Sequence, residues 1–414
     1  MKLRTIIISL LLCNIFLCSA HRHGNLFPII SWGGISAEKA DTLYALAKEC
    51  GFNTHLGLYS TQEKALLSMD AASRAGVGII INFPQLKDSP ETAVALTKNH
   101  PALVAYHIKD EPELDDFEWL KALQTKISSL DAAHPCYINL LPNWSWGVEE
   151  YSDNLELFAS EFDLPFYSFD NYPVVEDEGV VKVRPDWYRN LEEFSAMARR
   201  HGKPFWAFAL AKAHSITVPE VAVYPEPTIG HLRLQVFSNL LYGAQAIQYF
   251  NFTGIVDPST CEKKPAFDLI KQVNSEVLAY SPVFAGCSVS GVWHTGDSIP
   301  CGTVSLDAMP DGMPHERVRS LRIRPAGSET ESDVPAIGGD VSSSFGDRQM
   351  GAVVSLIENG GDTYLAVQNR SCLESAVLDI SFDGLVSLLT SDGSGPFSGQ
   401  PIVLEPGDVA IFQL

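Results

Sequence analysis

A pair of carboxylates followed by a proline, Asp110-Glu111-Pro112, carries the clearest chemistry in this sequence. The residues before it, 103–109, alternate apolar and polar side chains, as in a strand with one buried face. Pro112 lacks an N–H and ends the strand, which leaves both carboxylates at the strand's carboxyl end. Acid–base catalysis in α/β proteins takes place at such ends. The pair could equally cap the helix expected from Asp115, and the sequence context has to separate the two interpretations.

Short apolar runs alternate with amphipathic helical stretches between residues 25 and 283. Strands are predicted at 27–32, 53–59, 78–83, 103–109, 136–141, 166–170, 204–210 and 246–252. Helices are predicted at 37–50, 62–75, 91–99, 116–130, 149–162, 187–201, 231–242 and 267–280. Eight strand-then-helix units over about 250 residues predict a (β/α)8 TIM barrel, an α/β fold. A doubly wound sheet is the alternative, but only the bare pair Gly33-Gly34 follows the first strand, without a nucleotide-binding loop.

The pattern changes near residue 284, where helical periodicity gives way to short Val, Leu and Ile runs separated by turn residues. Antiparallel strands are predicted at 353–357, 363–368, 376–382, 386–389 and 409–414, with a long polar loop at 325–349. We therefore expect a leader over residues 1–20, a barrel over 21–283 and a β-sandwich over 284–414.

The composition restricts the classes of partner. Hydrophobic residues make up 46% of the chain, enough for a large core, and the net charge is −21 with a pI near 4.8. Such a charge argues against nucleic acid, an anionic membrane surface and a polyanionic substrate, although a local basic cleft could still bind an acidic sugar. Solubility is the simplest explanation of the charge.

The N-terminus has the pattern of a secretory signal. Basic residues at positions 2 and 4 precede an apolar run over 6–17, and small residues follow at 18–20. The mature chain is expected to begin near His21 and to work in a secreted, periplasmic or cell-surface location. Lipidation of Cys18 is the alternative, which the bulky Phe16 and Leu17 fit less well. No later segment reaches the roughly 20 apolar residues of a membrane span.

Six cysteines lie beyond the leader, and none of them has a metal-ligand spacing. We therefore predict neither a metal nor another cofactor. In an oxidising compartment Cys287 could pair with Cys261 or with Cys301, and the sequence does not decide between them.

The carboxyl ends of the predicted strands are rich in aromatic, amide and carboxylate side chains. In a barrel these ends converge on one cleft. Aromatic faces stack on sugar rings, while amides and carboxylates bind hydroxyl groups, so we expect an oligo- or polysaccharide substrate. The predicted contacts are Trp32, Asp110, Asn139, Tyr172, Trp206, His214, Tyr249 and Asn251. Trp206 and Tyr249 would serve equally well as barrel core.

Three sequence blocks, 105–112, 167–173 and 233–250, resemble strands 4, 6 and 8 of family 42-type glycoside hydrolases. These belong to the clan of retaining (β/α)8 enzymes that includes β-galactosidases. The resemblance implies that Glu111 is the general acid/base, at the glutamate of the clan's Asn-Glu-Pro signature. Asp110 stands where the clan has Asn, and its negative charge predicts a raised pKa for Glu111.

The chain departs from the family at strand 7, where the family places its nucleophilic glutamate. Residues 203–212 contain no carboxylate. A two-carboxylate mechanism needs a partner for Glu111 at ~5–5.5 Å for retention or ~6.5–9.5 Å for inversion. Asp170 is the first candidate, and Glu226 and Glu220 in the loop 215–229 come next. Asp170 could instead bind a sugar hydroxyl or orient Tyr172, and the two glutamates could be solvated loop residues.

Three functions are compatible with these residues. The first is a secreted glycosidase that cleaves O-glycosidic bonds with Glu111 as acid and a second carboxylate as partner. The second is a carbohydrate-binding pseudoenzyme that has lost the strand 7 nucleophile. The third is a lyase or isomerase that uses Glu111 and His107, but such enzymes usually recruit a metal or a phosphate loop, and the sequence has neither. The intact Glu111 and the aromatic cleft favour the hydrolase.

Overall fold

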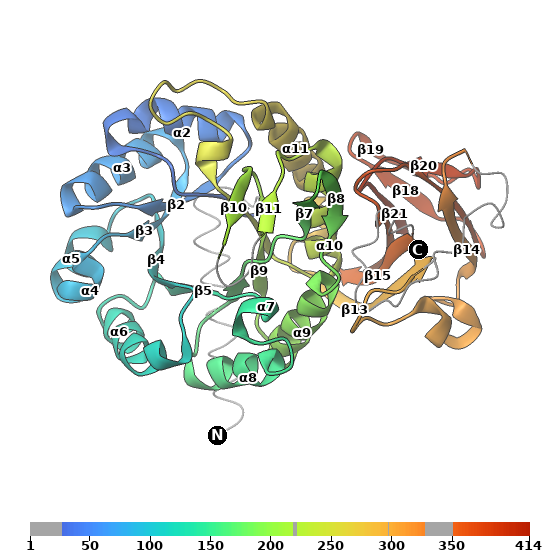
Figure 1. Ribbon diagram of the computed structural model, residues 1–414, viewed down its shortest axis with the longest axis horizontal. Coiled ribbons are helices and arrows are strands. Elements are labelled where there is room, and N and C mark those ends of the chain that lie inside the picture. The colour runs from blue at the N-terminus through green and yellow to red at the C-terminus, as the bar shows by residue number, and fades with distance from the viewer. Residues whose placement is uncertain (1–26, 218–221, 297, 328–350) are drawn as a thin grey trace.

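The computed structural model describes residues 27–217, 222–296, 298–327 and 351–414. Its N-terminal part is a closed barrel of parallel strands in the order β1-β12-β9-β6-β5-β4-β3-β2, which confirms the predicted TIM barrel (Figure 1). The barrel strands are β1 (Ile29–Trp32), β2 (Thr54–Leu58), β3 (Gly78–Asn82), β4 (Leu103–Asp110), β5 (Cys136–Leu140), β6 (Tyr167–Phe169), β9 (Phe205–Leu210) and β12 (Ala246–Phe250).

Helices surround the barrel in a ring, and along the chain each barrel strand is followed by one or two of them (Figure 1). They are α2 (Ala40–Glu49), α3 (Gln62–Ala75), α4 (Gln85–Asp88), α5 (Pro90–Thr97), α6 (Phe117–Leu130), α7 (Asn143–Trp146), α8 (Tyr151–Glu161), α9 (Trp187–Arg200), α10 (Ile229–Leu241) and α11 (Ala266–Phe284). The bounds of α3 match the prediction because Thr61 caps its first turn and Gly76 ends it in the left-handed conformation. The short helices α4 and α7 were not predicted, since four residues are too few to show a helical period.

Two loops at the carboxyl ends of the barrel strands pair with each other. The loop after β6 contains β7 (Val174–Asp177) and β8 (Val180–Val183), and the loop after β9 contains β10 (His214–Ile216) and β11 (Ala222–Tyr224). Together they form a four-stranded antiparallel sheet in the order β10-β11-β7-β8. The prediction of an irregular loop over 215–229 was therefore wrong in part. Strands of three residues carry little sequence pattern, and these are stabilised by pairing with a segment far away in the chain.

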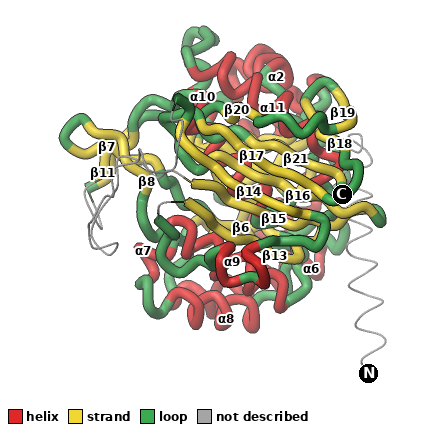
Figure 2. Tube along the Cα trace, turned by 90° about the vertical axis from the view of Figure 1, so that its right-hand side faces the viewer, coloured by secondary structure: helices red, strands yellow, loops and turns green. Residues whose placement is uncertain are grey.

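The described residues between 288 and 414 form two antiparallel sheets, of six and three strands, which confirms the predicted C-terminal β-sandwich. In Figure 2 these strands lie toward the viewer, and the helices of the barrel lie around and behind them. Apolar side chains from both sheets, among them Val354, Leu378 and Phe412, form one buried cluster between them. The strands are β13 (Ser288–Gly296), β14 (Val318–Pro325), β15 (Gly351–Asn359), β16 (Asp362–Asn369), β17 (Ala376–Phe382), β18 (Ser387–Thr390), β19 (Gly393–Pro396), β20 (Ile402–Leu404) and β21 (Val409–Gln413). Most of the long loop predicted at 325–349 falls outside the described residues.

Helix α10 lies between the barrel and the sandwich and is buried on almost all sides. Almost every residue from Gly230 to Leu241 is buried, because β9 covers one face of the helix and β15 and β16 cover the other. Gly230 is required by this close packing: a Cβ atom there would lie 2.4 Å from the carbonyl oxygen of Cys372.

Gln368 of β16 connects the sandwich to α10 through its side-chain amide. Its amide nitrogen donates to the carbonyl oxygens of Arg233, Leu234 and Gly407, and its amide oxygen accepts from the hydroxyl of Ser238. The side chain is fully buried, so water cannot replace any of these partners.

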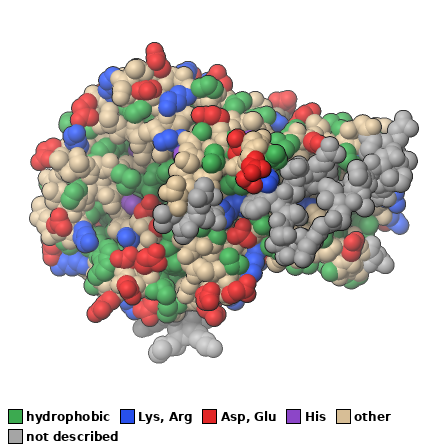
Figure 3. All heavy atoms as spheres, in the orientation of Figure 1, with side chains coloured by type: hydrophobic (Ala, Val, Ile, Leu, Met, Phe, Trp, Pro, Cys, Tyr) green, Lys and Arg blue, Asp and Glu red, His purple; other side chains and the backbone are tan. Residues whose placement is uncertain are grey.

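The described cysteines are all free, so neither of the pairings of Cys287 that the sequence allowed is formed. Within the described ranges, no helix combines the length and the apolar character needed to cross a bilayer. Acidic and basic side chains are interspersed on the face seen in Figure 3, as expected if the net negative charge mainly supports solubility.

Replacing Gln368 by Leu is expected to destabilise the protein by about 3 kcal/mol, because the buried Gly407 carbonyl and Ser238 hydroxyl would each lose the hydrogen bond to Gln368. Urea unfolding followed by tryptophan fluorescence measures the effect. Gln272→Leu, on the exposed face of α11, is the matched control and is expected to change stability by less than about 0.5 kcal/mol. Equal unfolding midpoints for the two variants would contradict this account of the interface.

Candidate active site

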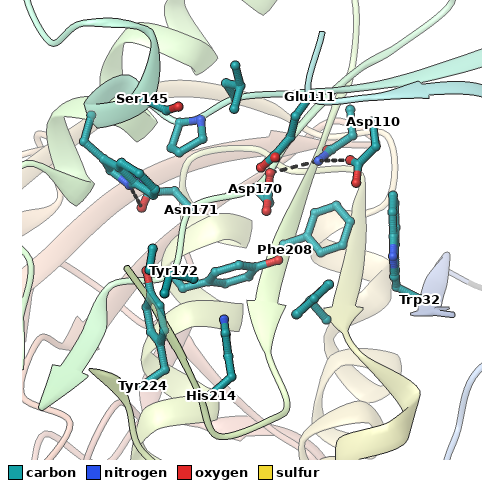
Figure 4. A pocket seen from close by; sticks show the side chains of 16 residues that line it. Trp32, Asp110, Glu111, Ser145, Asp170, Asn171, Tyr172, Phe208, His214 and Tyr224 are labelled. Atoms are coloured by element: carbon teal, nitrogen blue, oxygen red, sulfur yellow. Dashed lines mark hydrogen bonds between the residues drawn. The ribbon is translucent and has the colours of Figure 1, made fainter. Parts of the chain in front are cut away.

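A cavity of ≈ 310 Å³ opens at the carboxyl ends of the barrel strands (Figure 4). Strands β1, β4, β5, β9 and β12, the loop after β6, helix α7 and the β10–β11 hairpin contribute to its wall. The lining residues are Trp32, Asp110, Glu111, Asn139, Leu141, Pro142, Trp144, Ser145, Asp170, Asn171, Tyr172, Phe208, His214, Ile216, Tyr224 and Phe250.

The end of β4 turns Glu111 into this cavity. The pairing of β4 with β5 shifts register between His107 and Lys109, and Glu111 has a positive φ of 47°. Its backbone N–H donates to the carbonyl oxygen of Asn139 at 2.9 Å, which fixes the turn. A side chain other than glycine in this conformation costs about 1–2 kcal/mol, so the surrounding structure has to hold Glu111 there.

The alternative role of this segment, capping the following helix, is filled by other residues. Glu113 and Asp116 form a capping box around the short 3-10 helix η3 (Leu114–Asp116), and Asp116 also pairs with Lys109 at 3.2 Å. Asp110 and Glu111 are therefore left to line the cavity.

Asn139 at the end of β5 connects the carboxylates of two strands. Its Nδ2 donates to Oδ1 of Asp110 at 3.3 Å and to Oδ1 of Asp170 at 2.9 Å (Figure 4). Its Oδ1 accepts from the Ser168 hydroxyl at 2.9 Å, which fixes the amide so that its nitrogen faces the carboxylates. Asn139 is almost completely buried and is thus a rigid support for the carboxylate cluster.

Three carboxyl groups meet in the cavity, and the pKa of each is raised. Withdrawal from bulk water, followed by the charge of Asp110, raises the pKa of Glu111 to about 7. The same loss of solvation raises the pKa of Asp110 to about 6, although the hydrogen bond from Asn139 opposes it. Asp110 and Glu111 line the cavity and remain accessible to solvent there.

Asp170 lies in hydrogen-bond contact with Glu111, and the two carboxyl groups point toward each other (Figure 4). Loss of solvation and the negative charges of Glu111 and Asp110 raise the pKa of Asp170 well above its usual value. Two carboxyl groups in contact cannot both be ionised at low cost, which is why the charge of Glu111 contributes to the raised pKa of Asp170.

Tyr172 follows Asp170 on the same loop and points its hydroxyl group into the cavity beside it (Figure 4). The side chain is 8% exposed, and its hydroxyl group lies beside the carboxyl group of Asp170, within hydrogen-bonding range of it. It is close enough to Asp170 to affect the pKa of that group. The Tyr172 ring is fixed by Phe250, Tyr224 and His214, the last two stacked on each other at 4.6 Å between ring centroids.

The other side of the cavity is apolar. Trp32 and Phe208 pack edge to face at 5.3 Å, and Phe250 continues this surface toward Tyr172. Strand β9, from which Phe208 comes, contains no carboxylate. No lysine or arginine belongs to the lining, so the basic cleft that the sequence analysis allowed for an acidic sugar is not found here.

Trp144 forms a flat, partly exposed surface at the rim. Its indole N–H donates to Asn171 at 3.3 Å, and the Arg184 guanidinium lies over the ring, 4.8 Å from its centroid. Asn171 is held in turn by Asn190 at 2.9 Å. The indole is therefore pre-oriented for stacking on a ligand.

Most of the predicted site residues come together in the cavity: Trp32, Asp110, Glu111, Asn139, Asp170, Tyr172 and His214 line it. Glu226 is exposed and does not belong to the lining, and Glu220 lies outside the described residues.

Three predicted substrate contacts lie elsewhere. Trp206 stacks on Phe166 at 3.7 Å inside the barrel, because it stands near the start of β9 and below the cavity. Tyr249 points outward from β12 and packs against Phe52. Asn251 caps the 3-10 helix η4 (Phe252–Gly254) instead of lining the cavity.

The sequence analysis missed several lining residues. Phe208 and Phe250 read as ordinary core positions of their strands, and Tyr224 lies in the segment taken for an irregular loop. Asn171 had a usable signal, since it is adjacent to Asp170 in a block already singled out. Across the described ranges, no group of three or more His, Cys, Asp and Glu side chains has an arrangement that could hold a metal ion.

No family model matches this chain, and no curated protein matches it significantly. Among solved structures, one described as a glycoside hydrolase is similar with a TM-score of 0.51 at 14% identity, over 94% of this chain and 93% of that chain. A glycoside hydrolase family 5 structure from Bacteroides vulgatus ATCC 8482 also has a TM-score of 0.51, at 12% identity, over 94% of this chain and 90% of that chain. At such identities the similarity establishes the fold alone: a TIM barrel followed by a β-sandwich.

Proposed function

We propose that this protein is a glycoside hydrolase in which Glu111 donates the proton to the leaving oxygen and Asp170 is its partner carboxyl group. The contact between Glu111 and Asp170, inside an aromatic cavity at the catalytic end of a TIM barrel, is the observation that carries the proposal. Both similar structures are described as glycoside hydrolases, which agrees with this class of reaction.

The electrostatics of the cluster suit a general acid. An acid must arrive protonated, and the raised pKa of Glu111, about 7, keeps a large fraction of it protonated near neutral pH. Asp170 lies on the same side of the cavity as Glu111 and in contact with it, so it is placed to act on the proton of Glu111 or to bind another group of the substrate.

The walls of the cavity suit a sugar ring. Trp144 offers a pre-oriented aromatic face at the rim, and Trp32 and Tyr172 lie deeper. A volume of ≈ 310 Å³ is at the lower end of small-ligand sites, so the cavity encloses a short part of a glycan. The resemblance to family 42-type enzymes makes β-galactosides the first substrates to test.

A carbohydrate-binding protein without turnover is the second candidate, and the apolar surface of β9 favours it. Clan members carry their nucleophile at the end of that strand, and here Phe208 reaches the cavity instead. Such a protein would bind sugars in the same cavity and release them unchanged.

We also propose that residues 1–20 direct export. The evidence is the basic start and the apolar run of the leader, and these residues lie outside the described part of the structure. Expression with and without residues 1–20, followed by cell fractionation and N-terminal sequencing, tests it. Cleavage before His21 is the expected result, and an uncleaved protein retained in the cytoplasm would contradict it.

Glu111→Gln is expected to lower kcat by about 10²–10⁴-fold on substrates with poor leaving groups, because the leaving oxygen loses its proton donor. Steady-state assays on aryl glycosides and oligosaccharides measure this. Glu118→Gln, an exposed residue of α6, is the matched control and should keep full activity. Turnover that survives in Glu111→Gln would remove Glu111 from the mechanism. If the wild-type protein binds sugars but does not hydrolyse them, and Glu111→Gln binds them equally well, the carbohydrate-binding protein is favoured.

Asp110→Asn is expected to move the alkaline limb of the pH–activity profile toward acid by about one pH unit. The charge of Asp110 raises the pKa of Glu111, so removing it lowers that pKa and Glu111 loses its proton at lower pH. The profile of kcat/KM against pH reports this directly. Asp115→Asn, at an exposed position nearby, should leave the profile unchanged, and a shift of the limb toward alkaline pH in Asp110→Asn would refute the assignment.

A further inference from the structure

We propose, on the basis of the function above, that His214 is the general base of the reaction and that the glycosidic bond is hydrolysed with inversion of configuration. His214 takes a proton from the water molecule that attacks the anomeric carbon, while Glu111 protonates the leaving oxygen. Three observations carry the inference: the position of His214 in the cavity, the tautomer of its ring and the way in which the ring is held.

His214 and the carboxyl groups lie on different sides of the cavity. Asp110 ends β4 and Glu111 follows it, whereas His214 begins β10 in the loop after β9, three strands further round the barrel. All of them line the same space of ≈ 310 Å³. In Figure 4 the carboxyl groups lie along one edge of this space and His214 lies at another, with a ring nitrogen directed toward it. A sugar between them can be protonated from one side and attacked by water from the other.

The hydrogen bond of His214 decides which of its ring nitrogens can accept a proton. Its Nδ1 lies 3.1 Å from the backbone carbonyl oxygen of Lys212. A carbonyl oxygen only accepts hydrogen bonds, so Nδ1 carries the hydrogen atom and donates. In the neutral imidazole the other nitrogen, Nε2, therefore has a free lone pair. A histidine in this tautomer accepts a proton at Nε2, which is the role of a general base.

Aromatic neighbours hold the His214 ring in its orientation. Tyr224 pairs with His214 across the β10–β11 hairpin and stacks on its ring at 4.6 Å between centroids, with an angle of 19° between the planes. The rings of Phe250 and Tyr172 lie at 5.7 and 6.5 Å. The hairpin is held in turn by the pairing of β11 with β7. A base fixed in this way loses little freedom when the water and the sugar bind.

The reaction balances with water as the only other reagent. Glu111 gives its proton to the glycosidic oxygen as the bond from that oxygen to the anomeric carbon breaks. The water oxygen forms its bond to the anomeric carbon from the opposite side, and one of the water protons passes to Nε2 of His214. The resulting imidazolium returns its proton to the Glu111 carboxylate through solvent. The sugar is released with inverted configuration.

The configuration of the first product tests the proposal directly. Hydrolysis of an aryl glycoside that the wild type accepts, followed by proton NMR before the anomers equilibrate, is expected to show the inverted sugar. A retained product would overturn the role of His214 and leave the proposed hydrolase intact. Absence of turnover on every glycoside tested would contradict both proposals.

His214→Gln is expected to lower kcat by ~10²-fold or more on aryl glycosides with good and with poor leaving groups, because every substrate needs the same activated water. Glu111→Gln differs, since its loss falls mainly on poor leaving groups. His201→Gln, at the end of α9 and outside the cavity, is the matched control and should keep full activity. A rise in KM without a fall in kcat for His214→Gln would mean that His214 only binds the substrate, and would overturn the proposal.

Azide separates a general base from a residue that only supports the hairpin. Azide attacks the anomeric carbon without losing a proton, so it needs no base. In His214→Ala, added azide is expected to restore cleavage of an aryl glycoside and to yield the glycosyl azide of inverted configuration. Cleavage that azide leaves unrestored would assign His214 a structural role and overturn the proposal.

Glu220 is the competing base, because it belongs to the same loop and lies outside the described residues. Glu220→Gln is expected to keep the wild-type kcat on the substrates on which His214→Gln loses it. Loss of kcat in Glu220→Gln together with full activity in His214→Gln would transfer the role to Glu220.

The tautomer of His214 is open to measurement in the protein without substrate. Nitrogen-15 NMR of protein labelled at histidine identifies the His214 signals from their absence in His214→Gln. The neutral ring is expected to have a protonated Nδ1 and an unprotonated Nε2. The opposite tautomer would remove the proton acceptor from the cavity and overturn the proposal.

Discussion

The amide of Asn139 is the interaction on which the candidate site depends. The side-chain nitrogen of Asn139 donates to both Asp110 and Asp170, which lie at the carboxyl ends of the strands on either side of β5. Hydrogen bonds within the barrel fix the orientation of this amide. The Ser168 hydroxyl donates to the Asn139 oxygen, and Ser168 is held in turn by Gln248 from β12. If the amide were reversed, its oxygen would face two carboxylates and the cluster would separate.

This cluster lowers the stability of the folded protein, and favourable interactions elsewhere in the fold have to offset it. Glu111 has a positive φ, and Asp110, Glu111 and Asp170 all have raised pKa values. When a carboxyl group has a higher pKa in the folded state than in the unfolded state, the folded protein becomes less stable as the pH rises from the unfolded-state pKa toward the folded-state pKa. The site therefore destabilises the protein increasingly above about pH 4. Such a cost is typical of groups that are placed for chemistry.

The extensive contacts around the barrel are consistent with that demand. The sandwich packs on α10 and α11, which follow β9 and β12, and Gln368 connects it to α10 by fully buried hydrogen bonds. Every described residue that lines the cavity belongs to the barrel and its loops. We infer that the sandwich supports β9 and β12, which contribute Phe208 and Phe250 to the apolar wall.

The sequence by itself determined the barrel, the sandwich and the position of Glu111, because hydrophobic period and a strand-ending proline are local signals. It also identified Asp170 and Tyr172 as candidate site residues, because they lie at the carboxyl end of a predicted strand. How deep a strand residue lies in the barrel, and whether its side chain points inward, was decided by the tertiary structure. Trp206 and Tyr249 have the same sequence signature as Trp32, but Trp206 lies below the cavity and Tyr249 points outward from the barrel. The contact of Asp170 with Glu111 and the sheet that carries His214 arise between segments about 40 or more residues apart, and no local pattern encodes such pairing.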